Sequence, residues 1–256
     1  MPQTANAPRS AEHDPVVYPD GSVLLRPQEP KGARLIAAAV IVIAAIILGV
    51  IGAMQIANNF IYAADNQKAE IETMLKAGCT YDAPALINYA GMGNEDFTSA
   101  LQAAGYTLHA LPATSEANDI DVVKTNGKAK EADIDSFYTT SETDSNATSA
   151  VAILQNSWRL SVNRSTGESL RIRYADFTSG SIEAALKTAM ATQGLSDDQV
   201  SAEGTDESGN TYKEGVIEAN GTTYSWRISA TGLSEVYSIK NLPESAFFVG
   251  IRLTAQ

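Results

Sequence analysis

The stretch WRLSVNRSTGESLRIRY, residues 158–174, decides the fold of the C-terminal part of the chain. Apolar side chains occupy every second position on both sides of Ser165-Thr166-Gly167. Such alternation predicts strands with one buried face, and a three-residue connection that ends in glycine is typical of a hairpin. We therefore predict two antiparallel strands whose core-facing residues are Trp158, Leu160, Val162, Leu170, Ile172 and Tyr174.

The predicted hairpin gathers basic side chains on its other face. With a loop at residues 165–167, Arg159 lies opposite Arg173 and Ser161 lies opposite Arg171. Like charges directly opposed across strands are unfavourable, so this arrangement predicts a basic patch that attracts an anion. We take Arg159, Arg171 and Arg173 as candidate binding residues for a carboxylate of a partner or a phosphate of an envelope polymer. The alternative is neutralisation by the protein's own acidic loop or by a sister repeat.

A later stretch of the chain repeats the features of the first. The string WRLS at residues 158–161 returns as WRIS at residues 226–229, and Thr-Gly follows each string. An alanine-rich helical segment precedes each of them, FTSALQAAG in one case and IEAALKTAM in the other. This self-similarity indicates an internal duplication. By analogy with the first hairpin, we expect Arg227 to lie opposite Glu235.

The duplication predicts an α+β fold with two duplicated units, each a helix packed on a small antiparallel sheet. The first unit covers residues 94–177, with an acidic insertion, and the second covers residues 180–256. The strings SVNRSTGESLRI and YSWRISATGLSEVYSI resemble the strand, Thr-Gly, strand signature of the PepSY family. The resemblance implies tandem PepSY-like repeats and a role in peptidase inhibition or regulation at the cell envelope, without a shared catalytic residue.

Residues 35–54, LIAAAVIVIAAIILGVIGAM, form an uncharged apolar run near the N-terminus. An apolar helix of about 20 residues spans the hydrocarbon core of a bilayer, so we predict one transmembrane helix over residues 35–62. Basic residues mark the cytoplasmic side of such a helix. The proline-rich tail 1–34 is therefore expected to be cytoplasmic and disordered, and it ends with the basic residues Arg26, Lys31 and Arg34. Residues 63–93 are expected to form a juxtamembrane helix and linker, followed by an extracytoplasmic domain.

Small residues recur at a spacing of four within this run, at Ala45, Gly49 and Ala53. Residues at that spacing share one face of a helix, and small side chains allow two helices to approach closely in a membrane. The pattern predicts transmembrane association and thus a homo-oligomer.

The composition excludes several functional classes. The chain has 30 acidic and 18 basic residues and a net charge of −12, which makes it a poor binder of nucleic acid. Two histidines and one cysteine leave little material for a metal site or a catalytic triad. The sequence contains no nucleophile elbow, phosphate loop, Cys-x-x-Cys or HExxH motif. We expect no cofactor, no metal and no catalytic residue.

These features predict a single-pass bacterial cell-envelope protein with an accessory or regulatory role and no catalysis. Its expected partners are the lipid bilayer and an envelope protein or peptide bound by the tandem repeats. Two alternatives remain open, a pilin-like surface assembly subunit and an envelope hydrolase with an unrecognised site.

Overall fold

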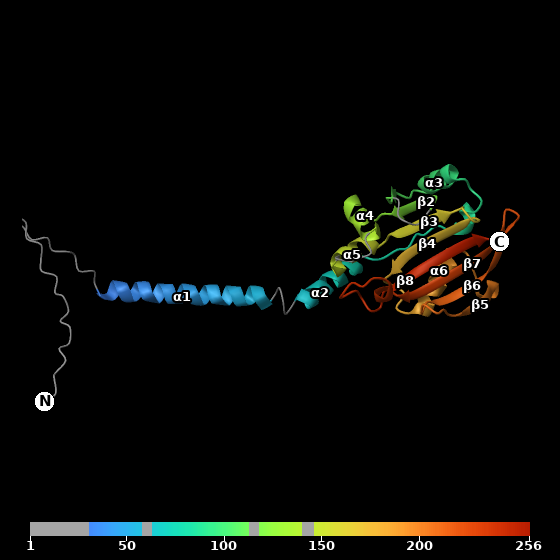
Figure 1. Ribbon diagram of the computed structural model, residues 1–256. Coiled ribbons are helices and arrows are strands. Elements are labelled where there is room, and N and C mark those ends of the chain that lie inside the picture. Colours follow the sequence, from blue (N-terminus) through green and yellow to red (C-terminus); the bar gives the residue numbers. More distant parts are fainter. Residues whose placement is uncertain (1–30, 58–62, 113–117, 140–145) are drawn as a thin grey trace, which may run out of the picture. The chain divides into compact units, whose positions relative to one another are not determined.

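The computed structural model describes residues 31–57, 63–112, 118–139 and 146–256. The chain divides into two compact units, Met1–Ile61 and Tyr62–Gln256 (Figure 1). In the first unit the described residues form the helix α1 (Lys31–Ile56). The second unit contains an antiparallel sheet and the helices that cover it.

The helix α1 contains the apolar run that the sequence assigned to the membrane. Among the residues that the structure describes, none of the helices combines the length and the apolar content that crossing a bilayer requires. The transmembrane helix predicted over residues 35–62 is therefore wrong. α1 ends at Ile56, and residues 58–62 lie outside the described residues.

Other predictions for this N-terminal part are not decided by the fold. Ala45, Gly49 and Ala53 are exposed on α1, and their part in association stays a prediction. Residues 1–30 of the predicted cytoplasmic tail lie outside the described residues. The extracytoplasmic location of the C-terminal domain also stays a prediction.

The described strands of the second unit form one eight-stranded sheet in the order β1-β2-β3-β4-β8-β7-β6-β5. β4 joins β8 through eight antiparallel residue pairs, from Ser169 with Thr254 to Asp176 with Phe247. The prediction of two separate small sheets is therefore wrong, although the α+β class holds. Edge strands expose unpaired backbone groups, and pairing β4 with β8 satisfies two such edges at once. The strands are β1 (Leu108–Ala110), β2 (Ile120–Lys124), β3 (Trp158–Asn163), β4 (Ser169–Asp176), β5 (Val200–Thr205), β6 (Thr211–Ala219), β7 (Thr222–Gly232) and β8 (Phe247–Ala255).

Each half of the sheet has four strands that are consecutive along the chain, and one helix of the main core precedes each set of four. α3 (Asn94–Ala103) precedes β1 to β4, and α6 (Ile182–Thr192) precedes β5 to β8. The short 3-10 helices η2 (Leu86–Tyr89) and η3 (Asp197–Gln199) lie before α3 and before β5. The predicted units thus correspond to halves of one sheet.

One face of the sheet packs against α3 and α6 and forms the main core. Trp158 on β3 and Trp226 on β7 lie in it and are 1% and 2% exposed. All six residues predicted to face the core from the β3–β4 hairpin are buried, which confirms the alternation. Gln193 ties the segment before α3 to α6, because its Oε1 accepts from the Leu86 N–H (2.8 Å) and its Nε2 donates to the Pro84 carbonyl (3.0 Å).

The opposite face of the sheet is covered over part of its area. A second apolar cluster joins side chains of β2, β4 and β8, including Val123, Ala175 and Phe248, to helices packed on this face. These helices are α2 (Ala63–Lys76), α4 (Glu131–Thr139), α5 (Ala147–Leu154) and α7 (Leu233–Val236). Arg171 and Arg252, on the same face beyond this cluster, are exposed. This part of the face is open to solvent.

At Gly215 on β6 the fold leaves no room for a side chain. A Cβ atom there would lie 2.1 Å from the carbonyl oxygen of Gln199 and 2.8 Å from Cζ2 of Trp226. The neighbouring strand β5 is irregular at the same level, with a register shift between Val200 and Ala202. Glycine at this position therefore allows the Gln199 carbonyl, just before β5, and the Trp226 ring to pack directly against β6.

Replacing Gly215 by alanine is expected to lower the free energy of unfolding by roughly 1–3 kcal/mol, because the new methyl group overpacks the core. Urea denaturation followed by tryptophan fluorescence measures the change. The matched control is Gly204→Ala on β5, where the nearest atom to a new Cβ, the Tyr212 hydroxyl oxygen, is 3.7 Å away. Equal losses for the two variants would contradict the close packing at Gly215.

Candidate anion-binding site

Five arginines from four neighbouring strands lie on the partly covered face of the sheet. Residues directly opposed in antiparallel strands point to the same face. Arg171 on β4 is opposed to Arg252 on β8, and Arg252 is opposed in turn to Arg227 on β7. The set, which we call the arginine face, consists of Arg159, Arg171, Arg173, Arg227 and Arg252.

The three arginines predicted from the first hairpin are brought together. Arg159 is opposed to Arg173, and Ser161 is opposed to Arg171. This confirms the predicted register of the hairpin. Anion binding by these residues stays a prediction at this point, because register alone does not show what the side chains hold.

Sequence reasoning misplaced Arg227 and missed Arg252. Arg227 is opposed to Glu214 on β6, so its predicted pairing with Glu235 is wrong. The Thr-Gly string at the end of β7 is followed by α7, which contains Glu235, instead of by a returning strand. The signal for Arg252 was the alternation in residues 247–253, which turns its side chain away from the core. Its arginine neighbours could not be foreseen, because they depend on the pairing of β8 with β4 and β7.

Arg159 is held firmly at one end of the arginine face. Its Nε donates to Oδ1 of Asp121 (2.8 Å), and its Nη2 contacts the other oxygen of the same carboxylate. The guanidinium carbon lies 5.5 Å from the centre of the Tyr138 ring. Burial raises the pKa of the Tyr138 hydroxyl, so this ring stays neutral beside the arginine. The charge of Arg159 is thus offset within the protein.

Arg227 is held in a similar way at the other end. Its Nη2 donates to Asp206 (2.9 Å) and its Nη1 donates to Glu214 (3.1 Å). Its guanidinium carbon lies 3.7 Å from the centre of the Tyr212 ring, a cation–π contact. The pKa of Asp206 is lowered, chiefly because the backbone N–H of Asn210 donates to its carboxylate, and Arg227 adds to the effect. Two carboxylates thus surround one guanidinium.

Arg252 lies between these ends and differs from both. Its side chain is exposed, and within the described part of the chain its guanidinium forms no ion pair. A cavity of about 250 Å³ opens beside it over β5, β6, β7 and β8, and its lining includes Glu214, Val216, Ser225 and Arg227. An exposed arginine next to a half-open cavity is suited to bind an anionic group from outside.

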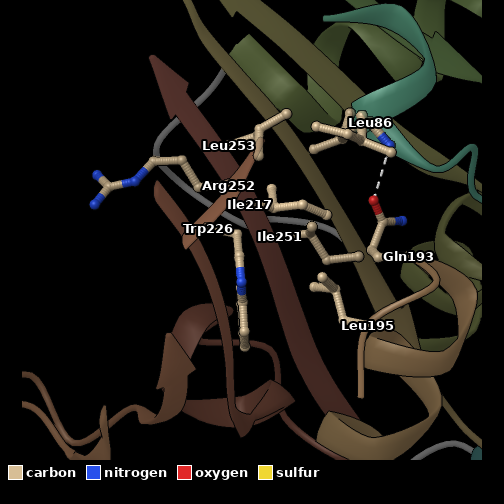
Figure 2. Close-up of a pocket in the computed structure, with 9 residues that line it drawn as sticks. Leu86, Gln193, Leu195, Ile217, Trp226, Ile251, Arg252 and Leu253 are labelled. Atoms are coloured by element: carbon tan, nitrogen blue, oxygen red, sulfur yellow. Dashed lines mark hydrogen bonds between the residues drawn. The ribbon is translucent and has the colours of Figure 1, made fainter. Parts of the chain in front are cut away.

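A second cavity lies on the other face of the sheet, against the main core (Figure 2). Its lining is mainly apolar and includes Leu86, Ile217 and Leu253, whereas the side chain of Arg252 points away from it. Its volume of about 20 Å³ corresponds to about one water molecule. Ligand pockets are usually far larger, so this cavity is a packing feature of the core.

Two further observations bear on the class of protein. In residues 31–57, 63–112, 118–139 and 146–256, no group of three or more His, Cys, Asp or Glu side chains is placed to hold a metal ion. Comparison with protein-family models, with curated proteins and with solved structures gave no match to this chain. Its function is therefore inferred from the geometry of the arginine face.

Replacing Arg252 by glutamine is expected to stabilise the fold. The change removes the like-charge pair that Arg252 forms with the directly opposed Arg171. Such a pair costs roughly 0.2–1 kcal/mol, so we expect the free energy of unfolding to rise by up to about 1 kcal/mol. Urea denaturation at low ionic strength measures the gain, which added salt should reduce.

The control for this measurement is Lys187→Gln, an exposed position on α6. It removes the same charge from the acidic chain, and its effect is expected to stay within about 0.5 kcal/mol. A clear loss of stability in Arg252→Gln would mean that Arg252 has a structural role that its exposure does not indicate.

Proposed function

We propose that this protein is a non-catalytic binding module whose arginine face takes an acidic segment of a protein or peptide partner. The observation that carries the proposal is the direct opposition of Arg171, Arg252 and Arg227 across β4, β8 and β7. This opposition destabilises the sheet by itself. A bound carboxylate offsets the repulsion through charge-assisted hydrogen bonds, for which the guanidinium group has the matching geometry. An accessory or regulatory role agrees with binding of this kind.

The surroundings of the arginine face favour a short acidic segment over a nucleic acid. Asp121 lies at one end of the face, and Asp206 and Glu214 lie at the other, each paired with an arginine. The whole chain carries a net charge of −12. A nucleic acid presents a long, dense row of phosphates, which the net negative charge of the chain repels. A few carboxylates above the centre of the face avoid this repulsion.

Several expectations from the sequence stay predictions beside this proposal. They are the resemblance to the PepSY family, the location at the bacterial cell envelope and self-association. No observation in the described residues favours the pilin-like subunit or the hydrolase, so neither is proposed as a second function.

Binding of a fluorescein-labelled hexaglutamate to the full chain, measured by fluorescence anisotropy at low ionic strength, tests the proposal. We expect the double variant Arg171→Gln/Arg252→Gln to weaken binding by about tenfold or more, which corresponds to about 1.4 kcal/mol. Urea denaturation of the double variant checks that it is folded under the assay conditions, so that a loss of binding is not mistaken for unfolding. Lys187→Gln, the charge-matched control, should bind like the parent.

Two further probes define the specificity of this binding. Labelled hexaglutamine lacks the carboxylates and should not bind, and added salt should weaken hexaglutamate binding because the contact is exposed. The proposal fails if hexaglutamate does not bind, or if it binds the double variant as tightly as the parent.

A further inference from the structure

The cavity beside Arg252 has a chemistry that narrows the choice of ligand. It opens over four adjacent strands, β5 to β8, and is lined by charged, hydroxyl and apolar groups, among them Glu214, Val216, Ser225, Arg227 and Arg252. Its volume of about 250 Å³ is enough for one amino-acid side chain and too small for a folded element. It is therefore a site for a single group of the partner.

The two arginines of the cavity have different charge environments. Arg227 is already bonded to Asp206 and Glu214, at 2.9 and 3.1 Å. In the part of the chain that the structure describes, Arg252 has no such carboxylate. We therefore expect an incoming anion to bind Arg252. Arg227, which is held in place by its two carboxylates, forms one side of the cavity.

Glu214 sets a limit on the charge of that anion. It lines the cavity together with Arg252, and its side chain is 37% exposed. A carboxylate has one negative charge and can turn both oxygens towards the guanidinium fork. A phosphate monoester carries a charge of about −1.5 to −2 at pH 7 and three acceptor oxygens, so part of its charge faces Glu214. Repulsion by Glu214 thus favours the carboxylate.

The apolar part of the cavity fits the same ligand. Val216 is 47% exposed, although it is a large hydrophobic residue, and it is directly opposed to Ser225 on β7. Its methyl groups lie in the lining that also contains Arg252. The methylene groups of an acidic side chain can cover this exposed valine while the carboxylate binds the arginine.

We propose that this cavity binds one carboxylate side chain of the acidic partner, which anchors the segment on the arginine face, and that it rejects a phosphate monoester at the same point. The proposal rests on the proposed function and adds the chemical class of the anchoring group. It also gives Glu214 a role in specificity, separate from its bond to Arg227.

The test uses two synthetic peptides, acetyl-Gly-Gly-Glu-Gly-Gly-amide and the same peptide with phosphoserine in place of glutamate. Each is titrated into the isotope-labelled full chain, and the backbone amide signals of Gly215, Val216 and Ser225 are followed by NMR. We expect the glutamate peptide to shift these signals in the parent and not in Arg252→Gln. The phosphoserine peptide is expected to bind about tenfold more weakly or not at all.

The variant Glu214→Gln separates charge discrimination from simple loss of the site. Asp206 still binds Arg227 in this variant, so the Arg227 side chain stays in place at the side of the cavity. We expect it to bind the phosphoserine peptide at least about fivefold more tightly than the parent does, with a smaller change for the glutamate peptide. The matched control is Glu218→Gln, an exposed glutamate further along β6, which should leave both affinities unchanged.

The outcomes distinguish this inference from the proposed function. If hexaglutamate binds but shifts signals only in β3 and β4, the anchor is wrong while the acidic-segment function stands. If the phosphoserine peptide binds the parent as tightly as the glutamate peptide, the discrimination is wrong and a phosphate-bearing partner replaces the carboxylate. If hexaglutamate does not bind at all, both proposals fail.

Discussion

The antiparallel pairing of β4 with β8 holds the two halves of the sheet together, and it also creates the arginine face. In a strand, successive side chains point to opposite faces. The register that places Ile172 beside Ile251 in the core therefore places Arg171 beside Arg252 on the other face. A shift of one residue would bury the arginines and expose the isoleucines. Core packing thus fixes the position of the charged row, and the repulsion within the row is a cost that the core has to exceed.

The protein offsets this repulsion at the ends of the row and leaves its centre exposed. Asp121 neutralises Arg159 from β2, and Asp206 and Glu214 neutralise Arg227 from the side of β6. Arg252 lies between them, exposed to solvent. The result is an exposed arginine on a chain of opposite overall charge. Under the proposed function, this arginine attracts an anionic partner to one point of the surface, while the net negative charge of the chain disfavours anions elsewhere.

The parts of the fold that are determined by residues close together in the sequence could be predicted from the sequence alone. The β3–β4 hairpin, its register at Arg159 and Arg173, and the buried position of Trp158 follow from alternation and turn chemistry. Contacts between distant segments could not be predicted, because a strand pattern does not say which strand is its partner. The β4–β8 pairing therefore stayed hidden, and with it Arg252 as a member of the site. The similarity between the two halves suggested separate sheets, whereas the free edges of the halves pair with each other.

The two outermost strands of the sheet have a consequence for how the protein behaves at high concentration. β1 has only three residues, and β5 contains an irregularity between Val200 and Ala202. A long, regular edge strand offers a row of backbone N–H and C=O groups to which strands of other molecules can add. Neither end of this sheet offers such a row. Among the strands that the structure describes, both edges are therefore poor templates for the addition of another strand.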